Sequence, residues 1–98
     1  MEVRVNVPIV TLSQAVDGMR APFLQGFGRS FTGQRLAAAA WSAFHASLTL
    51  GSGLEAATSH ALVAAQERNN RTALVARWSP GRISAVVEHA VARASNAG

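Results

Sequence analysis

The sequence predicts a mainly α-helical fold, with one short N-terminal β-strand followed by about four to five helices in a small bundle. Three observations predict it: alternating valines near the N-terminus, apolar residues at helical spacing through most of the remaining chain, and glycines and prolines between the helical segments. With 49% hydrophobic and 14% charged residues, the chain is too apolar for a disordered protein, and without cysteine it has no disulfide framework. Its 98 residues, 1–98, are therefore expected to form a single domain.

Residues 2–8 are expected to form the strand. Valine occupies every second position, and the positions between are polar: Glu2, Arg4 and Asn6. This period of two predicts an apolar face of valines and an outward polar face, and Pro8 ends the strand because it has no amide hydrogen to donate. A lone strand cannot satisfy its own backbone groups. Its partner is a second copy of the chain, another protein or a short returning segment.

Residues 11–48 are predicted to form helices with proline and glycine breaks. Pro22 is expected to interrupt the first helix, and Gly28 to separate it from the next. Ser30 or Thr32 then caps a helix that extends to about residue 48. The apolar side chains of this helix recur at four-residue steps and form one stripe: Leu36, Ala40, Phe44 and Leu48.

Residues 54–95 are predicted to form a helical C-terminal half. One helix covers about residues 54–68, and a short helical element follows at 72–78. Ser79-Pro80-Gly81 then separates this element from the last helix. The last helix has the clearest helical period in the chain, given by Ile83, Val86, Val87, Ala90, Val91 and Ala94.

The charge balance favours an anionic partner. The net charge is +4, and all nine cationic residues are arginine. Arginine presents a planar, permanently charged fork that matches phosphate and carboxylate groups. The same preference for arginine, together with abundant alanine and glycine, also arises from codon usage in a GC-rich genome, so composition alone leaves both explanations open.

The sequence predicts a cytoplasmic protein with no membrane partner. Residues 1–10 alternate charged residues with valine, which is unlike a secretory signal. The longest uncharged stretch, residues 36–54, has the length of a membrane span. Its alanines, serines and glycines favour a buried helix instead.

The chain lacks the side-chain groupings that enzymes use. Its five carboxylates are dispersed, with no pair three or four positions apart. Its three histidines, His45, His60 and His89, do not have the spacing of metal ligands. We therefore predict that the protein is not an enzyme, with no catalytic residue, no metal site and no cofactor.

The N-terminal half resembles the ribbon-helix-helix repressor family. The resemblance rests on the alternating strand at residues 3–7, the proline after it, an amphipathic helix, and Gly28-Arg29-Ser30 at the start of the next helix. In that family two chains pair their N-terminal strands into a ribbon that enters the major groove of DNA. The resemblance implies a homodimer in which Arg4 and Asn6 read base edges, and in which Arg29 and Ser30 anchor a phosphate.

The expected function is that of a small DNA-binding transcriptional regulator, which acts on duplex DNA as a dimer through its strand ribbon. A second DNA-binding interpretation places a helix-turn-helix over residues 74–91, with Arg82 at the start of the recognition helix. The alternative from another class is a helical oligomeric adaptor or inhibitor of the phage or plasmid type, which binds a protein partner. Steep salt dependence of duplex binding distinguishes the regulator from the adaptor.

Overall fold

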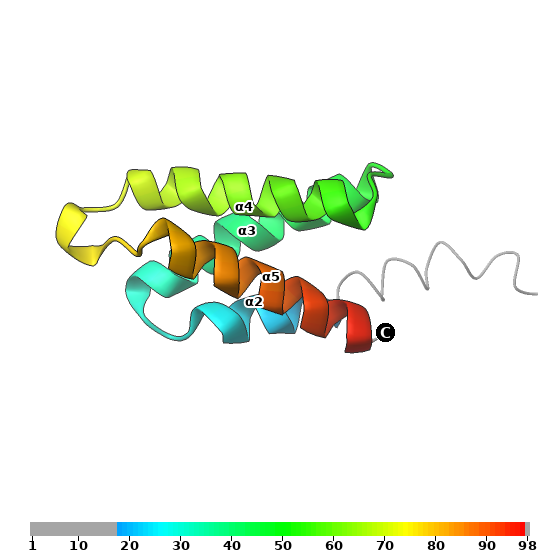
Figure 1. Ribbon diagram of the computed structural model, residues 1–98, viewed down its shortest axis with the longest axis horizontal. Helices are drawn as coiled ribbons and strands as arrows, with labels where there is room; N and C mark the ends of the chain where they lie inside the picture. Colours follow the sequence, from blue (N-terminus) through cyan, green and yellow to red (C-terminus); the bar gives the residue numbers. More distant parts are fainter. Residues whose placement is uncertain (1–17, 98) are drawn as a thin grey trace, which may run out of the picture.

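The computed structural model describes residues 18–97, which form four α-helices and one short 3₁₀ helix (Figure 1). The elements in chain order are α2 (Arg20–Phe27), α3 (Phe31–Thr49), α4 (Leu54–Asn70), the 3₁₀ helix η2 (Leu74–Ala76) and α5 (Pro80–Ala97). Helix α3 packs against α4, α2 packs against α3 and α5, and α5 also contacts α4. The α2–α3 and α4–α5 connections lie at the same end of the resulting bundle, on the left of Figure 1.

Alanine lines the interface between α3 and α4, which we call the alanine seam. On α4, Ala57, Ala61 and Ala65 recur every four residues and are fully buried, and α3 contributes the buried Ala40. Because an alanine side chain ends at Cβ, helices lined by alanine approach each other closely and gain dispersion contacts along their backbones. This makes α3 and α4 the most extensively packed pair of helices.

Aromatic side chains fill the space around α2. The ring centroid of Phe23 lies 4.9 Å from that of Phe44 and 5.8 Å from that of Trp41, and Phe27 lies 5.5 Å from Trp78. The rings are tilted against one another, an arrangement that their charge distribution favours over face-to-face stacking. These contacts attach the short helix α2 to α3 and to the connection that precedes α5.

The connection from α2 to α3 is a tight reversal. Gly28 has a φ of 78°, in the left-handed region that favours glycine. Ser30 then caps α3, because its Oγ accepts a hydrogen bond of 3.0 Å from the backbone N–H of Gly33. Of the two caps considered from the sequence, Ser30 is confirmed. A Cβ atom on Gly33 would collide with the carbonyl oxygen of Phe27, so this close approach requires glycine.

The predicted fold class is wrong in its β-strand. Residues 18–97 contain no strand, and in this part of the chain the protein is an all-α bundle. The alternating valines of residues 2–8, which predicted the strand, lie outside the described residues. A valine pattern indicates a strand only where a second strand pairs with it, and helices use their backbone donors and acceptors internally. The described helices therefore offer no sheet edge for such a strand.

Two local predictions also differ from the structure. Pro22 does not interrupt a helix, because it lies in the first turn of α2, where a missing amide hydrogen costs no helical bond. The short helix predicted at 72–78 is reduced to the three residues of η2, so the helix-turn-helix interpretation lacks its first helix. The predicted last helix is confirmed as α5.

No helix within residues 18–97 has the combination of length and apolar character needed to cross a membrane. The uncharged stretch 36–54 forms most of α3, the turn after it and the first residue of α4. Two of its large apolar side chains, Leu36 and Phe44, face the protein core and have no exposed surface.

Candidate functional site

Positive charge is concentrated at one end of the bundle, where the α2–α3 and α4–α5 connections lie together (Figure 1). We call residues 28–35 and 67–82 the basic end. It contains six arginines and one glutamate, a net charge of +5, whereas the other described residues contain two arginines and two glutamates. All of the excess positive charge of residues 18–97 thus lies at this end. The six arginines are Arg29, Arg35, Arg68, Arg71, Arg77 and Arg82.

A groove of about 470 Å³, which we call the arginine groove, lies between the start of α3 and the end of α4. Arg35 lines it from α3, and Arg68 and Arg71 line it from the end of α4. Arg35 and Arg68 also line a shallower hollow beside Ser42. Packing of α3 on α4 therefore brings together arginines that are more than thirty positions apart in the sequence.

The guanidinium groups of the arginine groove are free to bind an external anion. Within residues 18–97, none of Arg35, Arg68 and Arg71 forms an ion pair with a carboxylate or donates a side-chain hydrogen bond to the protein. Arg35 lies over the ring of Phe31, with 4.8 Å from its guanidinium carbon to the ring centroid. Like charges that share a groove raise its positive potential and attract anions.

A buried amide clamp fixes the connection that follows the groove. Asn69, in the last turn of α4, is only 2% exposed. Its Nδ2 donates to the carbonyl oxygen of Trp78 at 2.8 Å, and its Oδ1 accepts from the backbone N–H of Trp78 at 3.0 Å. One side chain thus satisfies both backbone groups of a buried residue nine positions away. The clamp holds the start of α5 against the end of α4.

Two arginines of the basic end stabilise the same connection. Arg77 donates from Nε to the carbonyl oxygen of Thr72 at 2.9 Å, and from Nη2 to that of Asn70 at 2.7 Å. A cation is favourable there because carbonyl groups at the end of a helix carry partial negative charge. The guanidinium group of Arg82 stacks on the indole of Trp78 at 3.6 Å from the centroid. Both side chains are therefore engaged in contacts within the protein.

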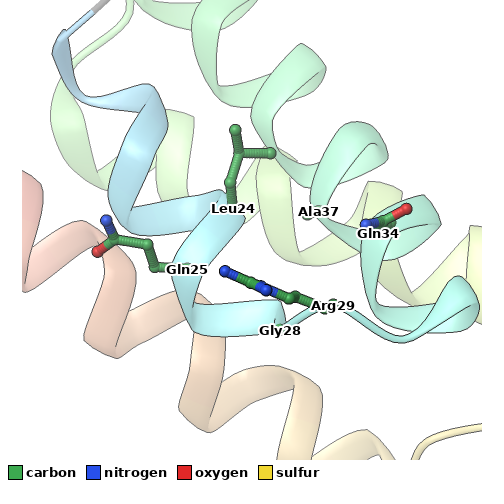
Figure 2. Close-up of a pocket in the computed structure, with 6 residues that line it drawn as sticks. All are labelled: Leu24, Gln25, Gly28, Arg29, Gln34 and Ala37. Carbon is green, nitrogen blue, oxygen red and sulfur yellow. The ribbon is translucent and has the colours of Figure 1, made fainter.

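The two residues that were predicted to anchor a phosphate lie next to each other at the start of α3, and neither lines the arginine groove. The hydroxyl group of Ser30 caps α3, and Arg29 does not line the arginine groove. Arg29 lines another pocket, of about 650 Å³, between α2 and α3, where its side chain points toward Gln25 (Figure 2). Leu24 and Ala37 give this pocket apolar walls. The two predicted base-reading residues lie outside the described residues: Arg4 and Asn6.

The structure also contains a serine–histidine pair that the sequence did not suggest. Nδ1 of His60 on α4 lies 3.0 Å from Oγ of Ser47 on α3. Ser47 is only 4% exposed, so the packed helices close the approach that a substrate would need. The pair joins α3 to α4 beside the alanine seam. Among residues 18–97, no three histidine, aspartate or glutamate side chains gather in a way that could hold a metal ion.

The arginine groove could not be identified from the sequence. Arg68 and Arg71 are three positions apart at a helix end, a pattern that is also typical of solvated helix termini. Nothing local connects them to Arg35, and nothing local marks Phe31 as an exposed aromatic residue. Both features depend on how α3 packs against α4.

In comparisons with known proteins, no family model, no curated protein and no solved structure matches the chain. The resemblance of its N-terminal half to the ribbon-helix-helix family stays a prediction. The arginine groove, defined by its geometry and its charge, is the candidate functional site.

Proposed function

We propose that the protein binds nucleic acid and that the arginine groove contacts its phosphate backbone. The observation that carries this proposal is the convergence of Arg35, Arg68 and Arg71 in one groove, with no carboxylate paired to them among the described residues. A guanidinium group is always charged and donates paired hydrogen bonds to phosphate oxygens. Each phosphate that it neutralises also releases counterions, which favours binding.

A polyanion fits the basic end better than a single small anion does. Arg35 and Arg68 line both the arginine groove and the neighbouring hollow beside Ser42, so the same two guanidinium groups can be reached from two adjoining depressions. The basic end as a whole carries a net charge of +5. A nucleic acid places one negative charge on each nucleotide and therefore contacts both depressions in succession, whereas one phosphate ion occupies only one of them.

This proposal retains the nucleic-acid binding that the sequence predicts, but it assigns the binding to the arginine groove and not to the N-terminal strand. The strand ribbon has no part in it, because the described residues contain no strand. Contacts to phosphates position a nucleic acid without reading its sequence. Transcriptional regulation, dimerisation and the choice of an operator therefore stay predictions.

Replacing Arg35 and Arg71 together with glutamine is expected to weaken nucleic-acid binding by about tenfold or more at low salt, because two charge-assisted hydrogen bonds to phosphate are lost. Both side chains are exposed, so the fold should tolerate the change. The slope of log affinity against log salt should become shallower by about 1.4 to 1.8. Fluorescence anisotropy with a labelled oligonucleotide at about 50 and 200 mM salt measures both quantities.

The matched control is the double replacement Arg20→Gln with Arg93→Gln. It removes the same charge from two exposed arginines outside the basic end. If the control weakens binding as much as R35Q/R71Q does, the groove is not the contact surface. If the unaltered protein binds neither duplex nor single-stranded DNA at about 50 mM salt, the proposed function is wrong.

The second candidate function is that of an adaptor that binds another protein. It is favoured by Leu74 and Val75 of η2, which are 77% and 99% exposed at the basic end. Apolar side chains beside arginine are typical of the centre of a protein interface. This candidate is preferred if the anisotropy experiment finds no affinity for nucleic acid.

A further inference from the structure

Phe31 is the most exposed aromatic side chain of the described residues. It is the first residue of α3 and is 72% exposed, whereas Phe23, Phe27 and Phe44 are at most 2% exposed. Burying a phenylalanine ring is one of the larger favourable contributions to folding, so leaving this ring in water forgoes stability. Its position is therefore not explained by the packing of the bundle.

The surroundings of Phe31 combine an open ring with positive charge. The ring lines the arginine groove together with Arg35, Arg68 and Arg71. The guanidinium group of Arg35, one helical turn further along α3, lies over one face of the ring at 4.8 Å. Since the residue is 72% exposed, the ring also has a large solvent-accessible surface that Arg35 does not cover.

This combination matches the chemistry of an unpaired nucleotide. In a duplex the bases are stacked on their neighbours and are not available to a ring beside the phosphate backbone. In a single strand the bases are free to stack on aromatic side chains, and a basic groove follows the backbone. Stacking needs only the π-face of a base and therefore tolerates any sequence.

We propose that Phe31 is a stacking platform for an unpaired base, so that the arginine groove takes single-stranded nucleic acid in preference to duplex. The base stacks on the exposed ring surface of Phe31, and Arg68 and Arg71 bind the adjoining phosphates from the α4 side of the groove. This inference rests on the proposed nucleic-acid binding and names the form of nucleic acid that the site takes.

The test compares Phe31→Leu with the unaltered protein. Leucine keeps an apolar side chain of similar size but has no π-face. The probes are a labelled oligothymidine of about 20 nucleotides, which is longer than one binding site, and a duplex of the same length. We expect the unaltered protein to prefer the single strand, and Phe31→Leu to lose about tenfold in affinity for it. Affinity for the duplex should stay within about twofold of that of the unaltered protein, since phosphate contacts are kept.

Two further variants test whether the loss of affinity comes from the aromatic ring of Phe31. Phe31→Trp should keep the affinity for oligothymidine that Phe31→Leu loses, because indole also stacks on bases. Leu50→Ala removes another exposed apolar side chain, 85% exposed in the turn at the opposite end of α3, and should change neither affinity. Thermal unfolding of each variant verifies that the fold is kept.

The outcomes separate this inference from the proposed function. If Phe31→Leu binds the single strand as tightly as the unaltered protein, while R35Q/R71Q binds it weakly, stacking on Phe31 is excluded and phosphate binding stands. A preference of the unaltered protein for duplex also overturns the inference and leaves the proposed function intact. If neither probe binds, the proposed function itself fails.

Discussion

Replacing Asn69 with alanine is expected to lower the free energy of unfolding by about 3 kcal/mol. The change removes the two hydrogen bonds, at 2.8 and 3.0 Å, that join Asn69 to the carbonyl group and the amide of Trp78. Trp78 is only 8% exposed, so its two backbone groups would be left without partners in a site that water does not reach freely. Each buried backbone group that is left without a hydrogen-bond partner lowers the free energy of unfolding by about 1–3 kcal/mol.

Asn70→Ala is the matched control for this prediction. Asn70 is the next residue of the same helix, and its side chain is exposed and forms no hydrogen bond within the described residues. Its replacement should change the free energy of unfolding by less than about 0.5 kcal/mol. Urea denaturation monitored by circular dichroism gives both values. Equal effects of the two replacements would show that the clamp contributes nothing to stability.

Gly33→Ala is expected to destabilise the protein by about 1–3 kcal/mol, although alanine is the better helix former. Gly33 lies in the first turn of α3, where a Cβ atom would collide with the backbone carbonyl oxygen of Phe27 and approach Oγ of Ser30 to 2.9 Å. A backbone atom in a tight reversal cannot move aside as a flexible side chain does. The strain would therefore be relieved by shifting α2 away from α3, at the expense of the aromatic contacts of Phe23.

Gly81→Ala should change stability in the opposite direction. Gly81 lies in the first turn of α5, and a Cβ atom there would meet nothing within 4 Å. Alanine should stabilise this helix by up to about 1 kcal/mol, because it loses less backbone entropy on folding. The midpoints of urea denaturation of the two variants provide the comparison. A stabilised Gly33→Ala variant would contradict the close approach between α2 and α3.

The helices were largely predictable from the sequence because their signals are local. Apolar side chains at four-residue steps placed a helix from about residue 30 to 48, and α3 covers Phe31–Thr49. The last helix was equally predictable, and the sequence limited the cap of α3 to Ser30 or Thr32. The helix predicted at 54–68 continues to Asn70, and in its last turn the side chain of Asn69 binds Trp78, nine positions along the chain. No pattern within a single helix shows such a contact.

The wrong predictions concern segments whose conformation depends on the rest of the molecule. Residues 72–78 contain the apolar residues of a short helix, but Leu74 and Val75 have no surface to pack against and are exposed. The arginine groove could not be predicted for a similar reason, since Arg35 and Arg68 lie together only through the packing of α3 on α4. The valine alternation of residues 2–8 is a local pattern whose meaning depends on a pairing partner.

The amide clamp has a consequence for hydrogen exchange. Trp78 lies in the connection between η2 and α5, outside any helix, and amides in such connections usually exchange with solvent rapidly. Its amide hydrogen is instead held by Oδ1 of Asn69 and is buried. It can therefore exchange only when this hydrogen bond opens and water reaches the site. In a deuterium-exchange experiment, the protection of this amide would report how often the connection at the basic end opens.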